Sequence, residues 1–265
     1  MGVKSFIISI LPKPLLRFIE PQYYKFQLFY SRLRWSLSKK ELDPYSIPIV
    51  INNYNRLEYL KRLISSLNKR GYMNIIILDN NSTYPPLLEY YDTVENIRII
   101  HLEHNYGYRA IWESGIVKKF WNTFYVYTDS DMEIDDNCPN NFLEYFLEVL
   151  DKYPQCHKVG FGLKIDDLPD YFHNKNNVIE HEKQFWDRLV GEGLYHAPID
   201  TTFALYRPYT GTSTNSKKFN IRTGAPYLIR HLPWYIDSTD LSEEELFYTK
   251  SIQKPTHWSI QNKNT

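Results

Sequence analysis

The chain has 265 residues, with 31 Lys and Arg against 31 Asp and Glu, so its balanced charge supplies no field that would attract nucleic acid. This length is enough for one large α/β domain with a sizeable core. The two cysteines, Cys138 and Cys156, have neither metal-site spacing nor the number for a disulfide framework, so we expect a protein of the reducing cytoplasm.

The first 44 residues differ in composition from the rest. Residues 1–40 contain five Lys and three Arg against one Glu, interleaved with aromatic and aliphatic side chains. A basic amphipathic segment of this kind can bind an anionic membrane, here the inner face of the cytoplasmic membrane. It can equally be a helix that packs on the domain with its charges in water, and the sequence leaves both interpretations open. No apolar run approaches the roughly 20 residues that span a bilayer.

From residue 47 onward, strand-like and helix-like segments alternate. We expect strands at 49–51, 75–78, 97–101, 124–128, 159–163 and 200–206. We expect helices at 57–67, from Pro85, at 110–120, from Pro139, and from Ser242, which would form a capping box with Glu245. This alternation predicts one α/β domain over residues 45–265, with a mostly parallel central sheet flanked by helices. The polar stretches 166–177 and 210–220 are expected to be loops.

Polar clusters follow four of the predicted strands. They cover residues 52–56, 79–82, 105–109 and 129–131. Each alone has a simple explanation as a helix cap or a turn. Parallel strands carry their carboxyl ends to one edge of the sheet, however, so the four clusters should converge on one crevice.

The last cluster is Asp129-Ser130-Asp131, two carboxylates separated by one small residue. Two acids so close together repel each other, and a hard divalent cation such as Mg²⁺ or Mn²⁺ removes that cost. We predict that Asp129 and Asp131 hold such a cation and that the cation binds a diphosphate. The alternative is a polar turn after a strand.

Four segments, read in order, carry a family resemblance: IVINNYNR, IILDNNST, HNYGYRAIWESG and YTDSDMEI. Together they resemble the family 2 group of GT-A glycosyltransferases. The resemblance implies a nucleotide-sugar-binding half (45–136) and an acceptor-binding half (137–265). In a UDP- or GDP-sugar complex, Asn52 and Tyr54 would touch the nucleobase and Asp79 the base or ribose. The other residues expected to line the nucleotide-sugar pocket are Arg56, Asn105, Gly107, Arg109 and Ser130.

The second half supplies the remaining candidate residues. An inverting transferase needs a carboxylate as general base. The candidates are Asp200, which enters the predicted 200–206 strand, the acids Glu243, Glu244 and Glu245 at the start of the last helix, and Asp237 and Asp240 in the loop before it. We favour Asp200 over Glu244. His231 would complete the metal shell, as a C-terminal His does in some GT-A enzymes, or would be a packing residue. Trp234 would stack on an acceptor sugar or fill the core.

The predicted function is metal-dependent, inverting transfer of a sugar to a hydroxyl of a glycan or lipid-linked acceptor, in cell-surface polysaccharide synthesis. One alternative is a nucleotidyltransferase that makes nucleotide-sugars, but INNYNRLEYL lacks the glycines of a phosphate-binding loop. The other alternative is a non-catalytic module that binds sugar or nucleotide. The intact Asp-Ser-Asp argues against such a module.

Overall fold

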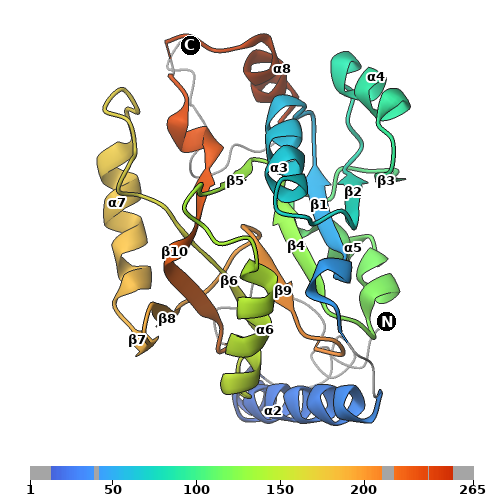
Figure 1. Ribbon diagram of the computed structural model, residues 1–265, viewed down its shortest axis with the longest axis vertical. Helices are drawn as coiled ribbons and strands as arrows, with labels where there is room; N and C mark the ends of the chain where they lie inside the picture. Colours follow the sequence, from blue (N-terminus) through green and yellow to red (C-terminus); the bar gives the residue numbers. More distant parts are fainter. Residues whose placement is uncertain (1–12, 39–41, 211–217, 238, 253–265) are drawn as a thin grey trace.

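The computed structural model describes residues 13–38, 42–210, 218–237 and 239–252 (Figure 1). The predictions for residues 1–12 and for most of the 210–220 loop therefore lie outside the described residues. The described strands, in chain order, are β1 (Ile49–Asn53), β2 (Ile75–Asp79), β3 (Arg98–His101), β4 (Tyr125–Asp129), β5 (Met132–Ile134), β6 (Lys158–Leu163), β7 (Leu189–Gly191), β8 (Leu194–His196), β9 (Ala204–Tyr206) and β10 (Ile221–His231). The α-helices are α2 (Lys13–Ser38), α3 (Glu58–Asn68), α4 (Pro85–Thr93), α5 (Ala110–Glu113), α6 (Phe142–Lys152), α7 (Lys175–Lys183) and α8 (Glu243–Ser251).

All of these strands belong to one sheet. Its order is β3-β2-β1-β4-β9-β6-β10-β8-β7, and β5 pairs with β10 off this path. The pairings β3-β2, β2-β1, β1-β4 and β6-β10 are parallel. The strands β9, β8 and β5 run against these six, while β7 runs with them. The predicted α/β class with a mostly parallel sheet is confirmed.

Apolar side chains cover both faces of the sheet. The strand β1 shows the division, because Ile49 and Ile51 belong to the larger core and Val50 to the smaller one. The larger core also contains the buried sides of α3, α4, α6 and α7, and the smaller core contains α5. Burial on both faces explains why β1 and β2 have no polar alternation until their last residues.

Three local predictions differ from the structure. The predicted helix at 110–120 is broken, because Gly115 has φ +78° and separates α5 from a 3₁₀ helix at Ile116–Phe120. Only Ala204–Tyr206 of the predicted 200–206 strand is a strand; the preceding residues turn toward β4. In the expected capping box, Ser242 accepts from the Glu245 N–H, but the Glu245 carboxylate binds Arg56 instead.

Helix α2 lies across one end of the molecule, opposite the end that carries α8 (Figure 1). Its docked face consists of Tyr24, Leu28, Ser31 and Trp35, which are buried or half-buried. Tyr24 packs edge-on against His157, just before β6, and Trp35 packs against Phe124, just before β4. The helix therefore lies where these strands begin, and part of the N-terminal segment packs on the domain. None of the helices in the described residues is long and apolar enough to cross a bilayer.

Candidate functional site

The ends of β1, β2 and β4 and the loop after β3 meet at one edge of the sheet. Asn52 Nδ2 donates to Asp129 Oδ1 at 3.2 Å and to the Gly107 carbonyl at 3.4 Å. Asn80 Nδ2 donates to Asn105 Oδ1 at 2.9 Å and to the same Gly107 carbonyl at 3.0 Å. Side chains from four separate segments thus share one hydrogen-bonded cluster, as the parallel strands require.

The two carboxylates of the Asp-Ser-Asp turn lie in different environments. Asp129 Oδ1 accepts from Asn52 and Oδ2 accepts from the Thr201 hydroxyl. Asp131 Oδ2 lies 3.4 Å from His231 Nε2, whereas the buried Asp131 Oδ1 receives no hydrogen bond from any described residue. Burial and the charge of Asp131 raise the pKa of Asp129 well above its usual range. Burial also opposes ionisation of Asp131, but the charge and hydrogen bond of His231, the charge of Arg56 and a backbone hydrogen bond together lower that pKa.

The donor set at this turn fits a divalent cation. It offers two carboxylates and an imidazole, which are ligands that Mn²⁺ and Mg²⁺ accept. Asp131 Oδ1 and Asn52 Oδ1 are buried and lack donors among the described residues, so each has a lone pair for a cation or ligand. The described side chains do not bring three or more His, Cys, Asp or Glu within mutual coordinating reach. Joint binding of one cation by Asp129, Asp131 and His231 would therefore require these side chains to move closer together, and ligand oxygen or water would complete the shell.

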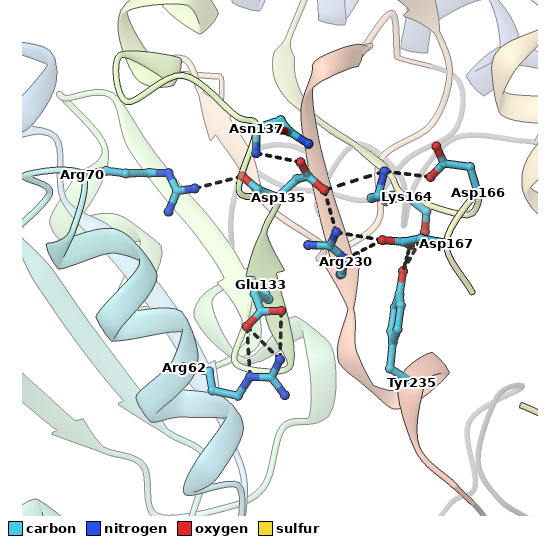
Figure 2. A network of polar contacts seen from close by, with 10 residues as sticks. All are labelled: Arg62, Arg70, Glu133, Asp135, Asn137, Lys164, Asp166, Asp167, Arg230 and Tyr235. Atoms are coloured by element: carbon cyan, nitrogen blue, oxygen red, sulfur yellow. Dashed lines mark hydrogen bonds and ion pairs between the residues drawn. The ribbon is translucent and has the colours of Figure 1, made fainter. Parts of the chain in front are cut away.

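His231 reaches Asp131 because β10 pairs with β5. The register places His231 opposite Met132 and Arg230 opposite Glu133. Figure 2 shows that Arg230 bridges Asp135 and Asp167, at 2.8 and 2.7 Å. This network fixes the end of β10 against the segment that follows the Asp-Ser-Asp turn.

Asp135 makes several other contacts in the same network (Figure 2). Lys164 lies 3.7 Å from Asp135 and 2.9 Å from Asp166, and Arg70 donates to the Asp135 carbonyl. The Asn137 N–H donates to the Asp135 carboxylate. Two cations therefore compensate the buried Asp135, and the loss of either would leave its charge less well paired.

Helix α8 closes over the loop after β1. Arg56 forms a buried ion pair with Glu245, and its guanidinium lies 3.5 Å from the ring centroid of Tyr248. Glu244 Oε2 accepts from the N–H groups of Leu57 and Glu58 at 2.8 and 3.0 Å, so it caps the first turn of α3. Burial raises the pKa of Glu244. The predicted base candidate Glu244 thus has one oxygen engaged at a helix end.

Other predicted pocket residues lie around the same edge. Tyr54 donates to the Ser251 carbonyl at 3.2 Å, and the Ser130 N–H donates to the Asn52 carbonyl. The buried Asp79 accepts from the Ser82 N–H and from Tyr91. Arg109 is half-buried and lies 3.4 Å from Glu113.

The remaining two candidates differ in exposure. Asp200 is exposed directly before Thr201, the residue that binds Asp129, and the charge of Asp200 contributes to the raised pKa of Asp129. Trp234 has only 2% of its surface exposed and packs edge-on against His231 in the larger core. Stacking of Trp234 on an acceptor sugar remains a prediction and would require the ring to leave this position.

Sequence reasoning missed three contributors to the site. Thr201 binds Asp129, and the fully buried Lys158 donates to the Ile199 and Asp200 carbonyls. Burial raises the pKa of Tyr248 to about 12, and the charges of Asp131 and Asp129 act in the same direction. Only Thr201 carried a local signal, its position directly after Asp200. Lys158 is distant in sequence from every motif, and Tyr248, although it follows Glu244 by four residues, is brought to the site by the packing of α8.

The family model of glycosyl transferase family 2 matches residues 49–207, from β1 to the end of β9. The chain belongs to glycosyl transferase family 2. The predicted family and its GT-A fold are confirmed. No curated protein matches the chain.

Among solved structures, this family 2 chain is similar to S. aureus TarS 1-349, with 16% identity, a TM-score of 0.42, and coverage of 71% of this chain and 60% of that chain. It is also similar to GalNAc-T7 with UDP, GalNAc and Mn²⁺, with 14% identity, a TM-score of 0.47, and coverage of 70% and 43%. The matches thus span less than two thirds of either solved chain. In this family 2 chain, His231 and α8 lie beyond the matched residues, so their roles rest on the contacts described above.

Proposed function

We propose that this chain transfers a sugar, with inversion, from a UDP- or GDP-sugar to a hydroxyl group, with the aid of a divalent cation. The single observation that carries the proposal is the shared cluster of Asn52, Asn80, Gly107 and Asp129 beside Asp131, whose Oδ1 lacks a donor in the described part of the chain. An acidic turn with open oxygens suits the cation of a nucleoside diphosphate. Ribose and base would lie along the ends of β1 and β2, near Asn52, Tyr54 and Asp79.

Asp129, Asp131 and His231 are the residues that would hold Mn²⁺ or Mg²⁺. When bound, the cation neutralises charge that develops on the diphosphate as the glycosidic bond breaks. Asn52 and Thr201 orient Asp129 through their hydrogen bonds to its two oxygens. The Arg230 network keeps His231 beside Asp131, so these two of the proposed ligands are held together by the fold.

Asp200 is the proposed general base. It would accept the proton of the acceptor hydroxyl as that oxygen attacks the anomeric carbon, and the nucleoside diphosphate would leave. Its exposure and its position one residue before Thr201 support this choice. Glu244 is less suitable, because one of its oxygens accepts two backbone N–H groups at the start of α3.

The acceptor class rests on the family resemblance alone. We propose a hydroxyl of a glycan or lipid-linked intermediate in cell-surface polysaccharide synthesis. A nucleotidyltransferase remains the competing enzyme, and it would release pyrophosphate from a nucleoside triphosphate and a sugar phosphate. A binding module without catalysis would retain the nucleotide but produce neither product.

The first experiment is a thermal-shift screen against UDP, GDP and their sugars, with and without Mn²⁺. Binding raises the melting temperature according to the ligand excess over Kd, and we expect one nucleotide to do so only with the cation present. The wild type and Asp131→Asn are then compared for donor hydrolysis and transfer. The exposed neighbour Asp136→Asn is the matched control. Loss of both activities by at least 100-fold in Asp131→Asn alone supports the metal assignment, and unchanged turnover refutes it.

A second pair of variants tests the base. Asp200→Asn should retain nucleotide binding and lose transfer, whereas Glu244→Gln should retain transfer. The reverse pattern would assign the base to Glu244. Release of pyrophosphate from a nucleoside triphosphate would identify the nucleotidyltransferase instead, and nucleotide binding without any turnover across the donor panel would identify a binding module.

A further inference from the structure

Helix α2 exposes a row of large apolar side chains, the apolar stripe, which consists of Phe26, Phe29, Leu33 and Leu37. Their exposed fractions are 63%, 62%, 45% and 66%. Separated by three, four and four residues, they lie on one face of the helix. The proposed reaction does not use this face. Adjacent exposed apolar side chains of this size indicate an interaction surface.

The apolar stripe lies opposite the docked face of α2. Leu33 follows Ser31 of the docked face by two residues, and at about 100° per residue this separates them by roughly half a turn. Packing of α2 on the domain therefore directs the stripe outward. The two faces of α2 therefore have different roles: the docked face holds the helix on the domain, and the stripe remains available to a partner.

The cations of α2 border the stripe. Lys25, Arg32 and Arg34 are all exposed, and residues 21–37 contain no Asp or Glu. The preceding residues 1–20 are also basic in sequence, with two Lys and one Arg against one Glu. An apolar row flanked by cations matches an anionic bilayer surface, in which acyl chains lie beneath negatively charged headgroups.

We propose that the apolar stripe binds the surface of an anionic membrane, with α2 lying parallel to the bilayer plane. Phe26, Phe29 and the two leucines would enter the boundary between headgroups and acyl chains, and the flanking cations would remain among the lipid phosphates. A second copy of the chain is a poorer partner for this face. A symmetric dimer through the stripe would bring the cations of the two α2 helices near one another without acids to compensate them.

Membrane binding through the stripe also sets the orientation of the site. The docked face contacts residues just before β4 and β6, whereas Asp129 lies at the end of β4. Figure 1 shows α2 and α8 at opposite ends of the molecule. A membrane-bound chain would therefore turn the acidic edge of the sheet toward water. This consequence rests on the proposed function and implies an acceptor that extends from the membrane or is soluble.

The test is co-sedimentation of the full chain with vesicles of phosphatidylcholine alone or with one quarter phosphatidylglycerol. The wild type should bind the anionic vesicles at least tenfold more tightly, and high salt should weaken the binding. Phe29→Ser/Leu33→Ser removes half of the stripe without a change in charge. Lys25→Gln/Arg32→Gln removes two cations without loss of apolar surface. Each double variant should bind at least tenfold more weakly than the wild type.

The matched control is Leu88→Ser on α4, which removes an exposed apolar side chain elsewhere and should bind as the wild type does. Circular dichroism and melting temperature check that the variants fold. Failure of the wild type to bind anionic vesicles, or wild-type binding by the Phe29/Leu33 variant, overturns the proposal. A wild-type dimer in light scattering that becomes monomeric in that variant would assign the stripe to a second copy. None of these measurements depends on sugar transfer.

Discussion

The buried Lys158 provides a quantitative test of the structure. Its Nζ is enclosed at the start of β6 and donates to the Ile199 carbonyl at 2.7 Å, the Asp200 carbonyl at 3.3 Å and the Tyr206 hydroxyl at 3.0 Å. Three acceptors match the three hydrogens of an ammonium group. Burial nevertheless lowers the pKa of Lys158 from about 10.5 to about 7, although Asp200 acts in the opposite direction.

This shift makes the free energy of unfolding depend on pH. Between pH 7 and pH 10.5 the unfolded chain keeps the Lys158 proton while the folded chain has released it, so the unfolded state binds more protons. Stability therefore rises with pH across this window. With one pKa unit equivalent to about 1.4 kcal/mol, we expect Lys158 to contribute an increase of roughly 2 kcal/mol between pH 7 and pH 9.

The perturbation is Lys158→Met, which preserves the length of the side chain and removes the charge. Urea unfolding is measured at pH 7 and pH 9 for both proteins, and the difference in their free energies of unfolding is compared. Because the other titrating groups are common to both proteins, their contributions to the free energy of unfolding cancel in this difference. The difference, wild type minus variant, should increase by roughly 2 kcal/mol from pH 7 to pH 9.

The exposed Lys69→Met is the control and should follow the wild-type pH profile. Parallel profiles of the wild type and Lys158→Met would mean that Lys158 keeps its ordinary pKa in the folded state. That result would refute the dominant effect of burial from which the prediction is derived.

Three further predictions concern stability. Glu245→Gln leaves the buried Arg56 without its counter-charge and should lower the free energy of unfolding by about 3 kcal/mol in urea. Burial lowers the pKa of His157 to about 3, so below pH 6.5 the unfolded state binds a proton that the folded state does not, and the wild type loses stability as the pH falls. His157→Phe lacks this group and should lose about 2 kcal/mol less stability than the wild type between pH 7 and pH 5. Gly160→Ala brings a Cβ to 2.4 Å from the Phe203 carbonyl, and it should cost roughly 3 kcal/mol, measured as a lower melting temperature.

Each of these predictions has a control in the chain. Glu243→Gln and His173→Phe change exposed side chains and should leave the stability and its pH dependence almost unchanged. Gly193→Ala adds a Cβ whose nearest neighbour is 3.8 Å away, so only the strain of its φ of +60° remains, about 1 kcal/mol. Equal effects in a variant and its control would contradict the packing or charge pairing assigned to that position.

The first half of the fold could be predicted from the sequence, because its apolar runs and polar clusters are local patterns. The apolar runs of β1 and β2 belong to strands buried on both faces, and the polar residues that follow them mark the edge of the sheet. Parallel strands can meet only with their carboxyl ends together, so convergence of the clusters that contain Asn52, Asn80 and Asp129 followed from pattern alone. The family was recognisable from the same four segments.

The second half was less predictable because its strands are short or interrupted. The strand β10 contains Gly224 and Pro226, which interrupt the strand pattern, so no strand is predicted in these 11 residues. The strand β9, only three residues long, lies between β4 and β6, and no local signal gives that order. Its place in the sheet is decided by pairing between segments far apart in sequence.

The site shows the same division between local and distant information. The sequence by itself determined that Asp129 and Asp131 follow a buried strand, because two residues of one turn need no partner to be adjacent. Only the tertiary structure decided that His231 lies 3.4 Å from Asp131 and that Arg56 pairs with Glu245, 189 residues away. These contacts arise when β10 pairs with β5 and α8 packs on the loop after β1, and their free energy comes from burial and charge pairing that no short stretch of sequence contains.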